Sequence, residues 1–89
     1  MIYECHITCS EGDAMLCEAV ARELHWKTSE IARDPMLGQA TYCYMTSHDV
    51  DLLRMYARMT TAVQRLGSVG VGVIRTKIEL IVHDSRGAT

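Results

Sequence analysis

An acid, an imidazole and a hydroxyl recur at every second position near the start of the chain, as Glu4, His6 and Thr8. Side chains of a β-strand alternate between its two faces, so these three groups share one face if segment 2–9 is extended. Such a row could transfer protons, with His6 as the acid or base, or it could hold a polar ligand. Glu4, His6 and Thr8 are therefore the candidate catalytic residues.

The intervening side chains are suited to a hydrophobic core, and they are Tyr3, Cys5, Ile7 and Cys9. One face of the predicted strand would then pack against other elements, and the opposite face would present the polar row. The rest of the chain must supply helices for the first face and neighbouring strands for the second.

Length and composition indicate one globular domain. The chain has 89 residues, of which 48% are hydrophobic and 22% are charged, and its formal net charge is -2. We expect a single domain over residues 1–83 and a polar tail over 84–89. The acidic balance favours neither a long nucleic acid nor a membrane surface as partner. Without a secretory leader or an apolar run of about 18 residues, the expected location is the cytoplasm.

The four cysteines, at positions 5, 9, 17 and 43, show no C-x-x-C spacing. They are expected to be reduced and buried, as small hydrophobic side chains. A zinc site that combines them with His6 is the alternative. No metal ion and no cofactor is predicted.

The spacing of apolar residues predicts two helices and four strands. The first helix follows a cap at Ser10 and continues to about Leu24, and the second is capped by Thr46 or Ser47 and ends at Gly67. Strands are predicted at 2–9, 25–31, 40–46 and 73–82, with 32–39 as a hairpin loop. The glycines at 67–72 follow a helix and precede a strand, which is the wrong order for a phosphate-binding loop.

The order strand, helix, strand, strand, helix, strand predicts an α+β fold, the ferredoxin-like split βαβ plait. In that fold a four-stranded antiparallel sheet carries two helices on one face, and the first and third strands are central. The other face, which we call the open face, carries Glu4, His6 and Thr8. The same alternation adds Arg75, Lys77 and Glu79 from the last strand, and Tyr42, Tyr44 and Thr46 from the third, unless a one-residue bulge exchanges the tyrosines for Cys43 and Met45.

Three functions suit this arrangement. In the first, the open face binds a small anionic, nucleotide-like ligand or a partner protein, with Arg75 and Lys77 supplying charge and Tyr42 and Tyr44 supplying stacking surfaces. Glu4 opposes a long polyanion in the same place. The open face could equally be solvated, or be covered by a second copy, and a homo-oligomer, most simply a dimer, is expected.

In the second, the protein is an enzyme. His6-Ile7-Thr8 resembles the His-x-Thr element of the two-histidine phosphoesterases, a resemblance which implies paired histidines that act as acid and base on a phosphodiester. His48-Asp49-Val50 lacks the hydroxyl of that element. A complete site would therefore require a homodimer that brings two copies of His6 together.

In the third, the protein only covers a partner's surface, through Met36 and Leu37 of the predicted loop. The motifs ECHIT at 4–8, WKTS at 26–29, DPMLG at 34–38, YMTSH at 44–48 and RTKIE at 75–79 resemble a family of small, largely uncharacterised α/β proteins of bacteria and their viruses. The resemblance implies no defined activity. It implies a viral-type inhibitor as a further alternative, and it selects for testing Glu4, His6, Trp26, Lys27, His48, Arg75 and Lys77.

Overall fold

The computed structural model describes residues 1–10, 14–31 and 42–82. Its elements are, in order, β1 (Ile2–Ser10), α1 (Ala14–Leu24), β2 (Lys27–Ile31), β3 (Tyr42–Asp49), α2 (Leu52–Ser68) and β4 (Val73–Ile81). The predicted loop at 32–39, with Met36 and Leu37, and the predicted tail at 84–89 lie outside the described residues. Within them, no helix is long and apolar enough to cross a membrane.

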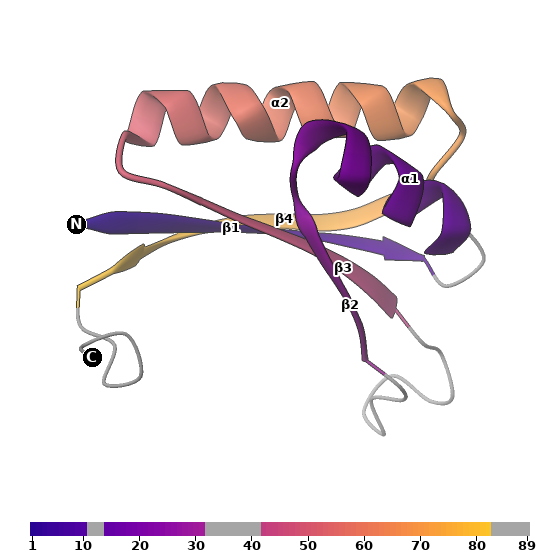
Figure 1. The fold of residues 1–89 in the computed structure, drawn as a ribbon, viewed down its shortest axis with the longest axis horizontal. Coiled ribbons are helices and arrows are strands. Elements are labelled where there is room, and N and C mark those ends of the chain that lie inside the picture. The colour runs from indigo at the N-terminus through magenta and orange to yellow at the C-terminus, as the bar shows by residue number, and fades with distance from the viewer. Residues whose placement is uncertain (11–13, 32–41, 83–89) are drawn as a thin grey trace.

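The four strands form one antiparallel sheet in the order β2-β3-β1-β4. Both helices lie on the same side of this sheet, and the opposite side carries neither of them (Figure 1). This is the ferredoxin-like arrangement, and the prediction of the fold class is confirmed. The first and third strands are central, as expected, so β2 and β4 form the two edges.

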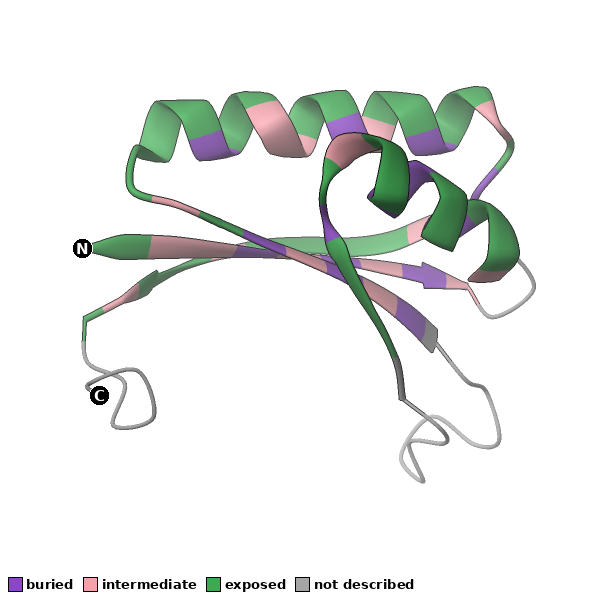
Figure 2. Cartoon of the chain, in the orientation of Figure 1, coloured by how far each residue is buried: buried purple, intermediate pink, exposed green. Residues whose placement is uncertain are grey.

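The core lies between the sheet and the helices (Figure 2). Cys5, Ile7 and Cys9 of β1 are fully buried, and β3 adds Cys43 and Met45 beside them. The helices contribute the buried side chains Cys17, Val20, Ala21, Met55, Ala62 and Leu66. The alternation of β1 therefore divides core from surface as predicted, and Cys43 and Met45 occupy the core positions of β3.

The four cysteines are buried, as predicted, and form no disulfide. Burial raises the pKa of the Cys5 thiol to about 11. The Sγ atoms of Cys17 and Cys43 are 3.4 Å apart. A hydrogen bond with Cys9, together with burial, raises the pKa of Cys17. The raised pKa values keep the Cys5 and Cys17 thiols protonated at neutral pH, which suits core residues rather than nucleophiles.

The start of α2 differs from the prediction. Strand β3 continues through Thr46 and Ser47 as far as Asp49, and Asp51 caps the helix instead. The Asp51 carboxylate accepts a hydrogen bond of 3.0 Å from the backbone N–H of Arg54. Hydroxyl residues are common both in strands and at helix caps, so their presence alone did not fix the boundary.

The end of α2 also differs, because the helix passes through Gly67 and stops after Ser68. The N–H of Val71 donates to the carbonyl of Leu66 at 3.0 Å, and the N–H of Gly70 donates to that of Gly67 at 3.1 Å. This pair of bonds is a Schellman motif. Gly70 is its left-handed residue, with φ of 82°.

Helix α1 ends in the same way, and this shortens the strand predicted at 25–31. Trp26 donates its N–H to the carbonyl of Ala21 at 2.7 Å, and His25 donates to that of Arg22 at 3.4 Å. His25 has the left-handed φ of 62°. Strand β2 therefore begins only at Lys27.

Candidate ligand-binding site on the open face

The register of the strands aligns open-face side chains in rows across the sheet. Ser29 of β2 pairs with Tyr44 of β3, Tyr44 pairs with Thr8 of β1, and Thr8 pairs with Arg75 of β4. We call these four residues the Arg75 row. On β1 and β3 the alternate residues are buried in the core, so Thr8 and Tyr44 point away from the helices. The cross-strand pairing places Ser29 and Arg75 on the same face.

Two further rows follow toward the beginning of β1. Lys77, His6, Thr46 and Lys27 form the second, and Glu79, Glu4 and His48 form the third. The predicted placement of Arg75, Lys77 and Glu79 beside the polar residues of β1 is therefore what the register shows. The Arg75 row thus carries one guanidinium and three hydroxyls, the second row carries both lysines, and the third row carries both carboxylates.

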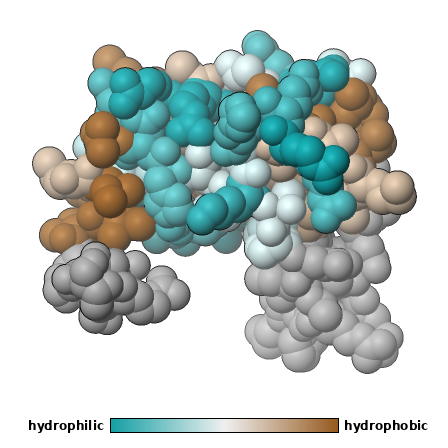
Figure 3. Space-filling view, in the orientation of Figure 1, coloured by the Kyte–Doolittle hydropathy of each residue, from teal (hydrophilic) through white to brown (hydrophobic). Residues whose placement is uncertain are grey.

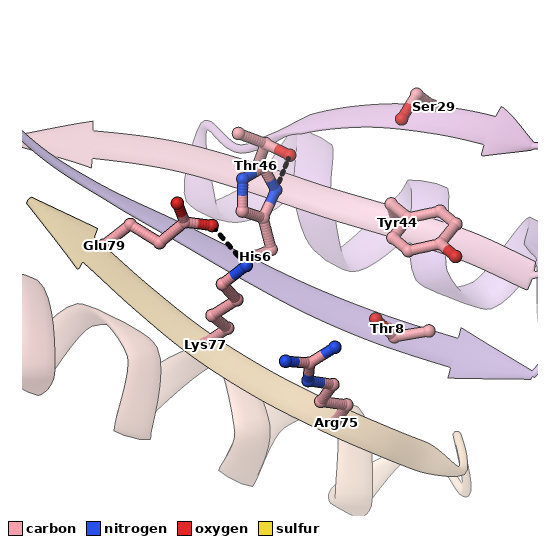
Figure 4. Close-up of a pocket in the computed structure, with 8 residues that line it drawn as sticks. All are labelled: His6, Thr8, Ser29, Tyr44, Thr46, Arg75, Lys77 and Glu79. Carbon is pink, nitrogen blue, oxygen red and sulfur yellow. Dashed lines mark hydrogen bonds and ion pairs between the residues drawn. The ribbon is translucent and has the colours of Figure 1, made fainter. Parts of the chain in front are cut away.

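A pocket of about 300 Å³ opens on this face. It is lined by His6, Thr8, Ser29, Tyr44, Thr46, Arg75, Lys77 and Glu79. All four strands contribute, and their side chains converge above the sheet (Figure 4). A ligand in this pocket would rest on the rigid backbone of the sheet instead of on a loop.

His6 is held from both sides. Its Nε2 contacts the Glu4 carboxylate, and its Nδ1 lies 3.0 Å from the Thr46 hydroxyl oxygen. A neutral His6 would donate a hydrogen bond from Nε2 to the Glu4 carboxylate and accept a hydrogen bond at Nδ1 from the Thr46 hydroxyl. Both ring nitrogens of His6 are thus hydrogen-bonded within the protein, and neither is available to a ligand in this arrangement.

Glu4 joins His6 to a second histidine. The other oxygen of its carboxylate lies 2.6 Å from Nε2 of His48, which stands directly opposite Glu4 on β3. His48 is more exposed than His6 and does not line the pocket. The Glu4 carboxylate of the third row is therefore shared by two imidazoles, those of His6 and His48.

Lys77 and Glu79 pair with each other along β4. The Lys77 ammonium lies 2.6 Å from the Glu79 carboxylate. This hydrogen bond and the lysine charge lower the pKa of Glu79. Much of the charge of Lys77 is therefore compensated within its own strand.

The Arg75 row differs from the other two rows in its hydrogen bonding. Within the described residues, Thr8, Ser29, Tyr44 and Arg75 have no hydrogen-bond or ion-pair partner in their side chains. The row offers one guanidinium and three hydroxyls to whatever enters the pocket. Guanidinium and hydroxyl groups are typical donors to phosphate and carboxylate oxygens.

Trp26, one of the positions selected from sequence, lies on the other side of the sheet. Only 6% of its surface is exposed, and it belongs to the core cluster. The Arg58 guanidinium stacks over its ring at 5.7 Å from the centroid. Lys27 and Ser29 lie on the open face, so the alternate positions Trp26 and Thr28 lie on the helix side, where both line a cavity beside α1. It cannot contact a ligand on the open face.

Lys27, another selected position, does not line the pocket. Lys27 is exposed and stands opposite Thr46. The backbone of Tyr42 pairs with Ser10 and Ile31, and its side chain lies outside the description, as do Met36 and Leu37. Conversely, Ser29 lines the pocket although the sequence pattern does not single it out. Its pairing with Tyr44 depends on the hairpin register, which the long connection between β2 and β3 leaves open.

No group of three histidine, cysteine, aspartate or glutamate side chains is placed to hold a metal ion in the ranges that the structure describes. The site is therefore built from a guanidinium, an ammonium, hydroxyls and an aromatic ring, with the carboxylate and imidazole cluster at one end.

No protein-family model matches the sequence, and no curated protein matches it either. The fold is similar to a solved structure assigned as an antibiotic biosynthesis monooxygenase from Chloroflexus aurantiacus J-10-fl. The TM-score is 0.50 at 13% identity, over 94% of this chain and 96% of that one. It is also similar to a formyltetrahydrofolate deformylase from Pseudomonas putida KT2440, with a TM-score of 0.51 at 8% identity. That match covers 93% of this chain but 30% of the deformylase. At these identities the likeness concerns the fold alone.

Proposed function

We propose that the protein is a small binding protein whose open face holds an anionic, nucleotide-like ligand. The observation that carries the proposal is the Arg75 row, in which a guanidinium and three hydroxyls line one pocket without partners among the described residues. The anionic group of the ligand would lie against Arg75 and Thr8. The ring of Tyr44 would support its planar part.

The distribution of charge favours a small anion. Arg75 forms no ion pair within the described residues and acts on Glu79 only through its charge, whereas the Lys77 ammonium is paired with Glu79 and the Glu4 carboxylate contacts two imidazoles. A ligand with one anionic end can avoid the carboxylates by placing that end in the Arg75 row. A long strand of nucleic acid would cross the third row, where Glu4 and Glu79 repel its phosphates.

A phosphodiesterase that uses His6 and Thr8 is the alternative function. In its favour, both residues line the pocket, and His48 joins His6 through Glu4. Against it, Glu4 and Thr46 engage both ring nitrogens of His6, so proton transfer to a substrate would require these bonds to break. A binding function needs no such rearrangement. A partner protein on the open face would use the same donors, and it is an outcome that the binding experiment distinguishes.

The experiment is a calorimetric titration with AMP and with inorganic phosphate. Arg75→Met removes the guanidinium and keeps an unbranched side chain of similar length. Hydrogen bonds to charged groups contribute about 1.5–3 kcal/mol, so the variant should bind AMP about 10- to 150-fold more weakly. Arg22→Met is the matched control, since Arg22 is an exposed arginine on α1, on the helix side of the sheet.

The result expected is AMP binding that Arg75→Met weakens and Arg22→Met leaves unchanged. If wild type binds neither AMP nor phosphate, or if both variants bind as wild type does, the open face does not hold an anion through Arg75. Chemical-shift changes in the amides of β1 and β4 on titration would locate the ligand independently of affinity.

A further inference from the structure

Strand β4 is an exposed edge of the sheet. In the described part of the chain it pairs only with β1, which leaves its outer backbone groups without a neighbouring strand. Most of its side chains are exposed, from Ile74 to Lys77 and again at Glu79 and Leu80. Exposed edges of this length are templates for pairing with another strand.

The helix side of this edge is apolar. Ile74 and Leu80 are 55% and 45% exposed, and Val82, just beyond the strand, is 80% exposed. Hydrophobic surface gathers at the end of the molecule where β1 begins and β4 ends (Figure 3). Helix α2 covers β4 incompletely, and an additional strand would bring apolar side chains to the uncovered part.

We propose that β4 pairs antiparallel with β4 of a second copy, with the two-fold axis at Ile78. In this register Lys77 lies opposite Glu79 of the second copy, and Glu79 lies opposite its Lys77. On the helix side, Thr76 faces Leu80 of the second copy, and Ile74 faces its Val82. The two sheets would become one sheet of eight strands.

Charge selects this register. An axis at Lys77 would pair Arg75 with Glu79 of the second copy at both symmetric positions, but it would set the two lysines directly opposite each other. An axis at Thr76 would set Arg75 opposite Lys77. Of these three registers, only the one with the axis at Ile78 sets no like charges opposite each other. Like charges directly opposite are destabilising in a sheet. With the axis at Ile78, Lys77 of each copy faces Glu79 of the other copy. Each of the four charged side chains therefore has neighbours of opposite sign, both along its own strand and across the interface. Charged residues usually discourage edge pairing, but this pattern is complementary to itself.

The proposal is independent of the proposed function. Antiparallel pairing about an axis perpendicular to the sheet keeps the helices of both copies on one side and both open faces on the other. The open faces stay uncovered. Arg75 would lie opposite Ile81 of the second copy, which brings no carboxylate to it. Loss of ligand binding would therefore not affect the dimer, and loss of the dimer would not remove the Arg75 row.

Charge reversal tests the register. Sedimentation velocity over a concentration series should show that the wild-type chain dimerises. Lys77→Glu alone sets two carboxylates opposite each other at both symmetric positions, and Glu79→Lys alone does the same with two ammonium groups. Each variant should raise the dimer Kd about tenfold or more.

Mixing the two variants is the decisive step. In a heterodimer the glutamate introduced at position 77 faces the lysine introduced at position 79 of the other chain, and the native Glu79 faces the native Lys77. The mixture should therefore dimerise with a lower Kd than either variant alone. A wild-type chain that stays monomeric, or single variants that dimerise as wild type does, would overturn the proposal. In the second case the interface lies elsewhere, as on the open face.

Cross-linking provides a readout that does not depend on charge. Ile78 would face its own copy with Cα atoms about 4.5–5.5 Å apart, within the range of a disulfide. Ile78→Cys should form a covalent dimer when oxidised with diamide. Thr76→Cys is the control, because its two copies would lie about 13 Å apart, and wild type reports on the four buried cysteines. Cross-linking of Thr76→Cys in place of Ile78→Cys would contradict the register.

Discussion

Thr8 and Arg75 lie directly opposite each other on neighbouring strands of the open face, and within the described residues neither side chain has a hydrogen-bond partner. Thr8 stands opposite Tyr44 on its other side. Neighbouring strands are about 4.8 Å apart, so Arg75 and Tyr44 are separated by about two strand spacings. That span suits a ligand with its anionic group at one end and a flat ring at the other.

Tyr44 should therefore contribute to binding of a nucleotide but not of inorganic phosphate. Stacking of a base on an aromatic side chain is worth about 1–3 kcal/mol by alanine substitution, so Tyr44→Ala should weaken AMP binding about 5- to 150-fold. Tyr44→Ala should change the affinity for inorganic phosphate only slightly. Titration of both ligands measures this difference, and Tyr44→Phe, which keeps the ring, is the control. Equal losses for AMP and phosphate would mean that Tyr44 shapes the pocket instead of stacking on a base.

Hydrolysis of phosphodiesters should not depend on His6. Because Glu4 and Thr46 occupy both of its ring nitrogens, we expect no His6-dependent turnover of bis(p-nitrophenyl) phosphate or of a cyclic nucleotide. General acid–base catalysis contributes about 10²- to 10⁴-fold in rate. Wild-type turnover that His6→Ala reduces to this extent would replace the binding function with the phosphodiesterase. His25→Ala is the control, since His25 lies at the end of α1.

The central strands and the face of each side chain could be predicted because alternation is a local property. Cys5, Ile7 and Cys9 are apolar where Glu4, His6 and Thr8 are polar, and this pattern alone assigns β1 to a sheet with one open face. The placement of Arg75 and Lys77 beside the polar residues of β1 followed from the same rule applied to β4 and from the order of elements.

The helix ends and the use of each polar group could not be predicted in the same way. Whether Gly67 or Gly70 ends α2 depends on which carbonyls the following N–H groups reach, and both glycines suit the sequence signal. Trp26 is buried because α1 ends in a left-handed residue, His25, which changes the direction of the chain before β2. That Lys77 is paired with Glu79 while Arg75 forms no ion pair within the described residues depends on side-chain geometry along β4.

Asp49 should stabilise the fold in a pH-dependent manner. Its carboxylate accepts hydrogen bonds of 2.6–2.9 Å from the Arg54 guanidinium, and Arg58 lies 3.4 Å away. The bonds from Arg54, and then one from the backbone of Asp51, lower the pKa of Asp49 in the folded state. A lowered pKa means that the stabilisation is complete above the unfolded value, about 3.9, and is lost as pH falls through the folded value.

Asp49→Asn should accordingly lower the Tm at pH 7, and the difference from wild type should shrink as pH falls below about 4. Thermal unfolding followed by circular dichroism between pH 7 and pH 2.5 measures the effect. Glu23→Gln is the control, because the ion pair of Glu23 with Arg65 is exposed on the helix surface and contributes little. A difference between wild type and Asp49→Asn that stays constant with pH would assign the loss to packing and not to charge.

The two glycines at the end of α2 should respond in opposite directions to the same substitution. Gly67 lies inside the helix, and a Cβ there would meet no atom within 4 Å. Alanine should therefore stabilise the helix, by about 0.5–1 kcal/mol, because glycine has more backbone freedom to lose on folding. Gly70 has equal space, but its φ of 82° is one that side chains rarely adopt.

Gly70→Ala should therefore destabilise the protein by about 1–2 kcal/mol, the cost of a left-handed backbone at a residue with a Cβ. The steric surroundings of the two positions are alike, so the comparison isolates backbone conformation from packing. Chemical denaturation of Gly67→Ala, Gly70→Ala and wild type measures both changes. The hydrogen bonds from Gly70 to Gly67 and from Val71 to Leu66 turn the chain from α2 into β4. If both variants destabilise the protein, α2 ends at Gly67 and β4 is reached by a different turn.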